Sequence, residues 1–253
     1  MKKSIKIVSF IIAVLAAITC FAGCGNKKAD KLIVGITEFE PMDYQDENGN
    51  WIGFDADMAK EFAKSLGKEA EFVVIDWNNK IAELNNGTID CVWNGMTLTE
   101  DVISAMSCTK AYCNNAQVVI VKKDVADKYK TADDCKGLRF AVEAGSAGEE
   151  QAKENGFTYT PVKDQATALT EIAAGTSDAA IIDSLMAAAM VGEGTSYANL
   201  TYTVSLNSEE YGVGFKKGSD LTEKLNKFFE ESEKNGLTQK TAEKYGVQAM
   251  LVK

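Results

Sequence analysis

Two segments of the chain combine glycine with a hydroxyl residue directly after a predicted strand. The first contains Gly95 and Thr97, and the second contains Gly145 and Ser146 before a predicted helix over residues 148–155. Free amide groups at the start of a helix favour an anion. Two such turns facing each other could hold one carboxylate between them, although each also fits a purely structural turn.

Acidic residues lie close to these turns. Asp183 ends the apolar run 179–182, where it could face a ligand or cap the helix that follows. Glu143 precedes the second turn, and Glu38 lies beside Phe39. We therefore expect a negatively charged site.

Aromatic side chains are candidates for the walls of the same site. Trp77 lies between Asp76 and Asn78, and the face of an indole ring attracts cations. Phe39 and Trp93 are similar candidates. Trp93 lies in a predicted strand, however, and could equally be a core residue.

The composition argues against several classes of protein. The chain contains no histidine, which removes the usual general base and the Ser-His-Asp triad. Its cysteines do not follow the CxxC spacing of structural zinc sites, and its net charge of −10 at pH 7 argues against nucleic acid as a partner. We expect no catalysis, no cofactor and no metal.

Four cysteines follow the N-terminal region, namely Cys91, Cys108, Cys113 and Cys135. We interpret them as mostly reduced and partly buried. An exported protein could also pair them, in one of three connectivities.

The N-terminal residues 1–23 have the pattern of an export signal, with lysines before an apolar run over residues 7–21. That run is too short to span a hydrocarbon core of ~30 Å comfortably. Cys24 follows Ala22 and Gly23, as in a bacterial lipobox, with Cys20 as a second candidate and an incidental cysteine as the alternative. We expect lipidation at Cys24, a tether over residues 24–30, and attachment to the extracytoplasmic face of the cell membrane.

From residue 31 onward, short β-branched runs alternate with amphipathic stretches. Strands are predicted over residues 32–36, 71–75, 89–93, 117–121, 138–142 and 179–182. Helices are predicted over residues 55–65, 78–85, 165–174 and 184–191, with Asp55 as an N-cap and Gly67, Gly87 and Gly175 as stops. This alternation indicates an α/β fold with largely parallel sheets, in which ligands bind at the carboxyl ends of strands.

Two polar stretches, over residues 122–136 and 205–211, divide the chain. We expect them to be crossovers between two lobes. Residues 31–120 and 206–253 would form the first lobe, and residues 121–205 the second.

Several segments follow one another in an order typical of one family: Leu32-Ile33-Val34-Gly35, Pro41-Met42-Asp43-Tyr44, Gly53-Phe54-Asp55, Gly87-Thr88-Ile89-Asp90, Gly95-Met96-Thr97-Leu98-Thr99, Ala144-Gly145-Ser146, Gly175-Thr176-Ser177-Asp178-Ala179 and Gly212-Val213-Gly214-Phe215. Together they resemble the family 3 bacterial extracellular solute-binding proteins, the polar amino-acid receptors of ABC importers. The resemblance implies a two-lobed periplasmic-binding-protein-like α/β fold of type II, with the ligand in the interlobe cleft. It also implies a monomer that delivers its ligand to an ABC permease.

The resemblance assigns roles to particular residues. The ligand's α-carboxylate would lie at the two glycine turns, its α-ammonium on Asp183, and its side chain against Trp77, whereas Gly53-Phe54-Asp55 and Asp178 are interpreted as structural. The predicted ligand-binding residues are Glu38, Phe39, Trp77, Asn94, Gly95, Met96, Thr97, Glu143, Ser146 and Asp183.

One position departs from the family pattern. Val102 stands where an arginine usually clamps the ligand carboxylate, and the single arginine, Arg139, lies in the other lobe. A lost charge-assisted contact costs about 1.5–3 kcal/mol. A cationic amino acid, an amine, or a ligand whose carboxylate is absent or masked is therefore expected, unless Lys110 supplies the missing charge.

Two other functions use the same fold. A cyclohexadienyl dehydratase would need carboxylate clamps and a placed acid, and the lack of arginine and histidine in the cleft argues against it. A receptor sensor domain would continue into a membrane-spanning helix, and no such span is expected after residue 248.

Overall fold

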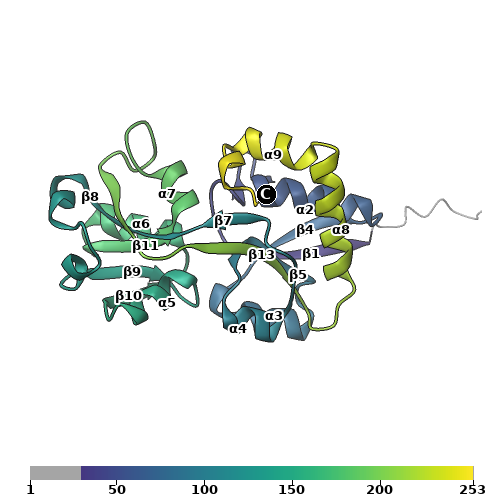
Figure 1. Cartoon of the computed structure of the whole chain (residues 1–253), viewed down its shortest axis with the longest axis horizontal. Helices are drawn as coiled ribbons and strands as arrows, with labels where there is room; N and C mark the ends of the chain where they lie inside the picture. The colour runs from purple at the N-terminus through teal and green to yellow at the C-terminus, as the bar shows by residue number, and fades with distance from the viewer. Residues whose placement is uncertain (1–29, 253) are drawn as a thin grey trace, which may run out of the picture. The chain divides into compact units, whose positions relative to one another are not determined.

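The computed structural model describes residues 30–252, and the expected signal peptide and Cys24 lie outside them. The first lobe is built on a six-stranded sheet (Figure 1) with the strand order β4 (Glu69–Val74), β1 (Lys31–Ile36), β5 (Cys91–Thr97), β13 (Glu209–Phe215) and β6 (Ser107–Cys108), and with β7 (Cys113–Asn115) also paired to β13. β1 runs parallel to β4 and β5, whereas β13 runs antiparallel to β5. A short hairpin of β2 (Tyr44–Gln45) and β3 (Trp51–Ile52) lies outside this sheet.

The second lobe is built on a five-stranded sheet with the order β10 (Thr158–Val162), β9 (Arg139–Glu143), β11 (Ala179–Asp183), β8 (Gln117–Lys122) and β12 (Leu200–Ser205). β9 runs parallel to β10 and β11, whereas β8 is antiparallel to β11 and β12. The expectation of largely parallel sheets is therefore wrong in part. β8 and β13 directly follow the two crossovers, so each enters its sheet from the other lobe and is antiparallel to the strands beside it.

Helices contact both faces of each sheet. In the first lobe these are α2 (Phe54–Ser65), α3 (Lys80–Asn86), α4 (Glu100–Ala105) and α8 (Leu221–Lys234), and in the second α5 (Ala147–Glu154), α6 (Gln165–Ala174) and α7 (Ser184–Met190). The last helix, α9 (Leu237–Tyr245), packs on α2 and α8. Short 3₁₀ turns are η1 (Trp77–Asn79), η2 (Lys123–Lys128), η3 (Asp133–Cys135) and η4 (Gln248–Met250). No helix in residues 30–252 is long and apolar enough to cross a membrane.

Burial on both faces explains the continuous apolar strands. In β8, Val118 and Ile120 pack into one hydrophobic cluster, while Val119 and Val121 pack into another on the opposite face. Successive side chains of a strand point to opposite faces. A strand covered on both sides is therefore apolar throughout, without polar alternation.

The chain crosses between the lobes twice. It leaves the first sheet after β7 and enters the second at Gln117. Residues 117–120 therefore belong to the second lobe, whereas the sequence analysis placed them in the first. It returns between β12 and β13, over residues 206–208, close to the expected boundary. The first boundary was misplaced because the apolar run of β8 resembles a first-lobe strand until its pairing partners are known.

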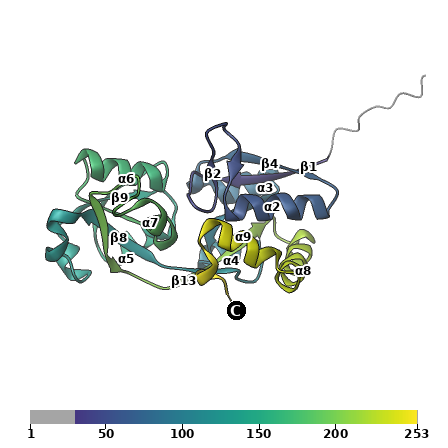
Figure 2. The same cartoon turned by 90° about the horizontal axis from the view of Figure 1, so that it is seen from above.

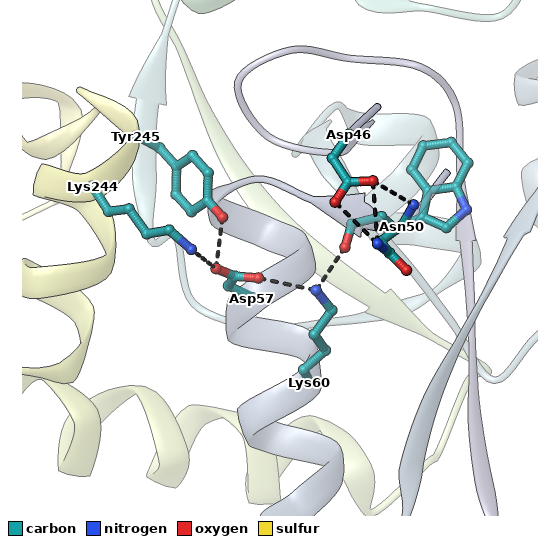
Figure 3. Close-up of polar contacts among 7 residues, drawn as sticks. Asp46, Asn50, Asp57, Lys60, Lys244 and Tyr245 are labelled. Carbon is teal, nitrogen blue, oxygen red and sulfur yellow. Dashed lines mark hydrogen bonds and ion pairs between the residues drawn. The ribbon is translucent and has the colours of Figure 1, made fainter. Parts of the chain in front are cut away.

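The C-terminal helices complete the first lobe, as expected, and Figure 2 shows α9 beside α2. Asp57 links α2 to α9 by accepting hydrogen bonds from Lys244 Nζ at 2.7 Å and from Tyr245 OH at 2.6 Å (Figure 3). Its other oxygen accepts from Lys60 Nζ at 3.0 Å. These donors lower the pKa of Asp57, against the effect of its burial.

Gly53 and Phe54 have the structural roles expected of them. Gly53 has a φ of 127°, and a Cβ there would overlap the carbonyl of Met42, so only glycine fits. Phe54 is buried in the core. Asp55, in contrast, is not the N-cap of α2, because the helix begins at Phe54 and Gly53 occupies the cap position.

Candidate functional site

A small cavity lies at the carboxyl ends of β5, β9 and β11, and both lobes contribute to it. Its free volume is about 20 Å³, roughly the room of one water molecule. It is lined by Thr37, Phe39, Trp77, Asn94, Gly95, Thr97, Glu143, Ser146, Gln165 and Asp183. Most of the residues predicted to bind ligand are therefore brought together.

Two predicted residues do not line this cavity. Met96 is buried with its methyl group close to Gly214, and it borders only the neighbouring cleft. Glu38 accepts a hydrogen bond from the amide of Gln45 at 3.3 Å. Both lie next to lining residues in sequence, but their side chains point elsewhere because side chains alternate along extended chain.

Asp183 is the last residue of β11 and is 4% exposed. Its carboxylate accepts hydrogen bonds from the side-chain amides of Asn115, Gln117 and Gln165. A carboxylate offers about four acceptor sites, and the side chain of Tyr211 also lies close enough to Asp183 to lower its pKa. Burial, followed by the charge of Glu209, raises the pKa of Asp183 to about 7. Its side chain does not cap α7, contrary to the alternative that the sequence left open.

A second buried network ties Asp183 to both crossovers. Glu209, at the start of β13, accepts from Asn115 at 2.7 Å, from Gln117 at 2.8 Å and from Thr97 Oγ1 at 2.9 Å. The amides of Asn115 and Gln117 also reach Asp183. Asp183 is thus hydrogen-bonded to β7 and β8 on the two sides of the first crossover, and it shares these two donors with Glu209, which follows the second crossover.

Glu143 is the last residue of β9 and is 2% exposed. Its Oε1 has no hydrogen-bond partner among residues 30–252. Burial, followed by the charge of Asp183, raises the pKa of Glu143 to about 8, although the nearby side chains of Thr37 and Lys80 act in the opposite direction. The cavity therefore contains two carboxyl groups at the ends of neighbouring parallel strands.

The two glycine turns are present, but their amides are already occupied. The amide of Gly95 donates to Asp55 at 2.7 Å, and the amide of Gly145 donates to Glu149 at 2.6 Å. Ser146 Oγ accepts from the amide of Glu149 and so caps the start of α5. Side chains of the protein therefore occupy the amides of Gly95 and Gly145, and the binding of a ligand carboxylate at the two turns stays a prediction.

No cation replaces the missing arginine within the cavity lining. Val102 is buried below the neighbouring cleft, which has a volume of about 400 Å³. Arg139 pairs with Asp178 on the surface, consistent with a structural role for Asp178. The expectation that Lys110 supplies a charge is wrong, because its ammonium lies on Glu230 of α8 at 3.1 Å.

Lys80 is the cation closest to this region, and sequence reasoning missed it. It is buried at the start of α3, and its Nζ donates to the carbonyl oxygens of Gly145 at 2.7 Å and Trp77 at 3.3 Å. Its ammonium also lies 5.0 Å from the centre of the Trp77 ring. Burial lowers the pKa of Lys80 to about 8, although nearby Glu143 and Glu149 act in the opposite direction.

Sequence reasoning also missed Thr37 and Gln165. Thr37 directly follows β1, so the rule that ligands gather at strand ends could have found it. Its Oγ1 donates to Asn94 Oδ1 at 2.9 Å. Gln165 begins α6, and no sequence pattern indicated that it reaches Asp183. Among the described residues, no group of histidine, cysteine or acidic side chains could hold a metal ion.

The family model of bacterial extracellular solute-binding proteins, family 3, matches residues 32–248. The chain therefore belongs to this family. The fold and the position of the cavity agree with that membership, since the cavity lies between two α/β lobes at strand ends.

Similar proteins bind amino acids. The arginine-binding extracellular protein ArtP of Bacillus subtilis is 30% identical over 251 residues, covering 93% of this chain and 97% of the relative. A solved ancestral arginine-binding protein bound to arginine is 34% identical with a TM-score of 0.79, covering 86% of this chain and 99% of that one. The structure of the ancestral amino-acid-binding protein AncCDT-1, a precursor of cyclohexadienyl dehydratase, is 32% identical with a TM-score of 0.77. The match covers 85% of this chain and 95% of that one.

Proposed function

We propose that this protein is the substrate-binding component of an ABC importer for amino acids or amino-acid-like small molecules, and that it binds without catalysing a reaction. The observation that carries the proposal is buried Asp183 in the interlobe cavity, whose carboxylate can pair with a ligand ammonium. The names of the relatives support the ligand class.

Binding would work by closure of the lobes. Trp77, Asn94 and Thr97 come from the first lobe, whereas Glu143, Ser146 and Asp183 come from the second. A ligand that contacts both sets stabilises the closed state more than the open one. The closed form would then be the form that the permease recognises.

The experiment is a thermal-shift screen of the purified protein against amino acids and amines. A ligand at about 100 times its Kd adds about 2.7 kcal/mol to the free energy of unfolding. For a domain of this size, that corresponds to roughly 5–10 °C in Tm. If no compound of either class raises Tm, the proposal fails.

We also propose that residues 1–23 are removed and that Cys24 carries lipid, including palmitate, so that a monomer is held on the outer face of the cell membrane. Intact-mass measurement of protein extracted from membranes tests this point. Lipid should be lost, and the protein released, when Cys24→Ala is introduced.

An enzyme of the cyclohexadienyl dehydratase type is the second candidate, because AncCDT-1 is described as a precursor of one. Incubation with prephenate-like acids, followed by product analysis, would distinguish an enzyme from a binding protein. We expect no turnover, since the lining of the cavity has no arginine to clamp the carboxylates of such a substrate, and Arg139 pairs with Asp178 on the surface.

A further inference from the structure

The cavity is acidic on the second-lobe side, with no cation in its lining. Glu143 and Asp183 end neighbouring parallel strands, and each is more than nine-tenths buried. Lys80 lines the neighbouring cleft, where carbonyl oxygens of Gly145 and Trp77 hold its ammonium. The lining residues of the cavity therefore carry two acidic groups and no basic one.

The two carboxyl groups differ in their partners. Asp183 is held by three side-chain amides, whereas Oε1 of Glu143 has none within residues 30–252. An unpartnered buried acceptor is costly unless something in the bound complex satisfies it. Glu143 lines the same cavity, so a ligand atom is a suitable partner.

Most hydrogen-bond donors at the cavity already have partners, whereas the hydroxyl of Ser146 accepts from the amide of Glu149 and can still donate. The amide of Gly95 donates to Asp55, and the amide of Gly145 donates to Glu149. The hydroxyl of Thr97 donates to Glu209. The hydroxyl of Thr37 goes to Asn94. A carboxylate in this cavity would meet Glu143 and Asp183, which disfavours it. The nearby cation, Lys80, is already held by the carbonyl oxygens of Gly145 and Trp77.

From this arrangement we infer that the ligand carries two cationic groups and no free carboxylate, as an alkyl diamine or a guanidino-amine does. One cation pairs with Asp183 and the other with Glu143. The alkyl spacer lies along Phe39 and Trp77, whose rings line the cavity and also favour cations. This placement needs the lobes to stand further apart than here, where the cavity has room for about one water molecule. This inference rests on the proposed function and specifies the ligand class of the same site.

Matched pairs of ligands test the inference, because each pair differs only in the α-carboxylate. Calorimetric titration of the purified protein would compare agmatine with L-arginine, cadaverine with L-lysine, and putrescine with L-ornithine. We expect the amine of at least one pair to bind at least about tenfold more tightly than its amino acid. If the amino acid binds more tightly in every pair, or only neutral amino acids bind, the inference is overturned while the proposed function stands. If nothing binds, both fail.

Two substitutions should move this selectivity in opposite directions. Glu143→Gln keeps the shape of the side chain and removes its charge, so it should weaken amine binding about tenfold or more and reduce the preference over the amino acid. Val102→Arg should strengthen binding of the amino acid relative to the amine. Asp178→Asn is the matched control, since it removes one carboxylate of the second lobe at the surface. An unchanged amine preference in Glu143→Gln would contradict the assignment of the second cation to Glu143.

Discussion

Lys80 of the first lobe donates a hydrogen bond of 2.7 Å to the carbonyl oxygen of Gly145 in the second lobe. Gly145 lies between β9 and α5 with a φ of 72°, and a Cβ there would be 2.6 Å from Cα of Asn78. The lobes thus meet backbone against backbone beside the cavity. This contact provides two tests of lobe closure.

Gly145→Ala should disfavour the closed conformation, because the new methyl group meets the backbone of Asn78. Small-angle scattering should show a larger radius of gyration, and ligand affinity should fall at least about tenfold. Gly156→Ala is the control, since Gly156 has a similar φ of 67° but open space around a Cβ. Equal effects of the two substitutions would mean that backbone strain, and not lobe contact, is responsible.

Lys80→Met should also shift the ligand-free protein toward open conformations. A hydrogen bond from a charged group contributes about 1.5–3 kcal/mol, so the ratio of open to closed molecules should rise roughly tenfold or more. Fluorescence energy transfer between dyes on the two lobes measures this ratio. Lys153→Met should leave it unchanged, because Lys153 pairs with Glu149 within α5. No shift in Lys80→Met would show that the bond does not hold the lobes together.

Asp183→Asn should weaken ligand binding by at least about tenfold, because it removes the charge that faces a ligand ammonium. Circular dichroism should show a retained fold, since an asparagine oxygen can still accept from Gln117 or Gln165. Calorimetric titration measures the loss. Binding within about twofold of the unchanged protein would exclude Asp183 as the ammonium partner.

The stability of the ligand-free protein should fall as pH rises from about 5 to 8. The pKa values of Glu143 and Asp183 are raised to about 8 and about 7 in the folded state, so between their unfolded and folded pKa values the folded protein binds more protons. The free energy of unfolding then decreases by up to about 1.4 kcal/mol per pH unit for one carboxyl group. Urea unfolding at several pH values should show this slope, reduced in Glu143→Gln. A cationic ligand should bind more tightly over the same rise in pH, because it favours the ionised carboxylates.

The four cysteines of the described chain are free, and they should differ in reactivity. Cys91, Cys113 and Cys135 are buried, whereas Cys108 is partly exposed. Burial raises the pKa of Cys113 to about 12 and of Cys135 to about 11, and the thiolate is the reactive form. A thiol reagent should therefore react first with Cys108, and Cys108→Ser should remove the fast phase. A fast phase that survives this substitution would show that a buried thiol is accessible.

Local signals were sufficient for many elements. The bounds of α6 agree with the prediction, since Asp164 caps its start and Gly175 ends it in a left-handed conformation. The ends of β9 and β11 were also close to those predicted, and they place Glu143 and Asp183 in the cavity. Residues 117–120, in contrast, were assigned to the wrong lobe because an apolar run does not reveal which strands pair with it.

The strand-end positions of Glu143 and Asp183, the glycine turns and the valine at position 102 could be recognised from residue types and their spacing. Which of these groups have free donors or acceptors depends on contacts made in the folded protein. Asp55 and Glu149 occupy the turn amides, three amides hold Asp183, and Oε1 of Glu143 is left without a partner. Residue type and spacing define which donors and acceptors a chain carries, but hydrogen bonds between residues as distant in sequence as Asn115 and Asp183 form only when folding brings them together.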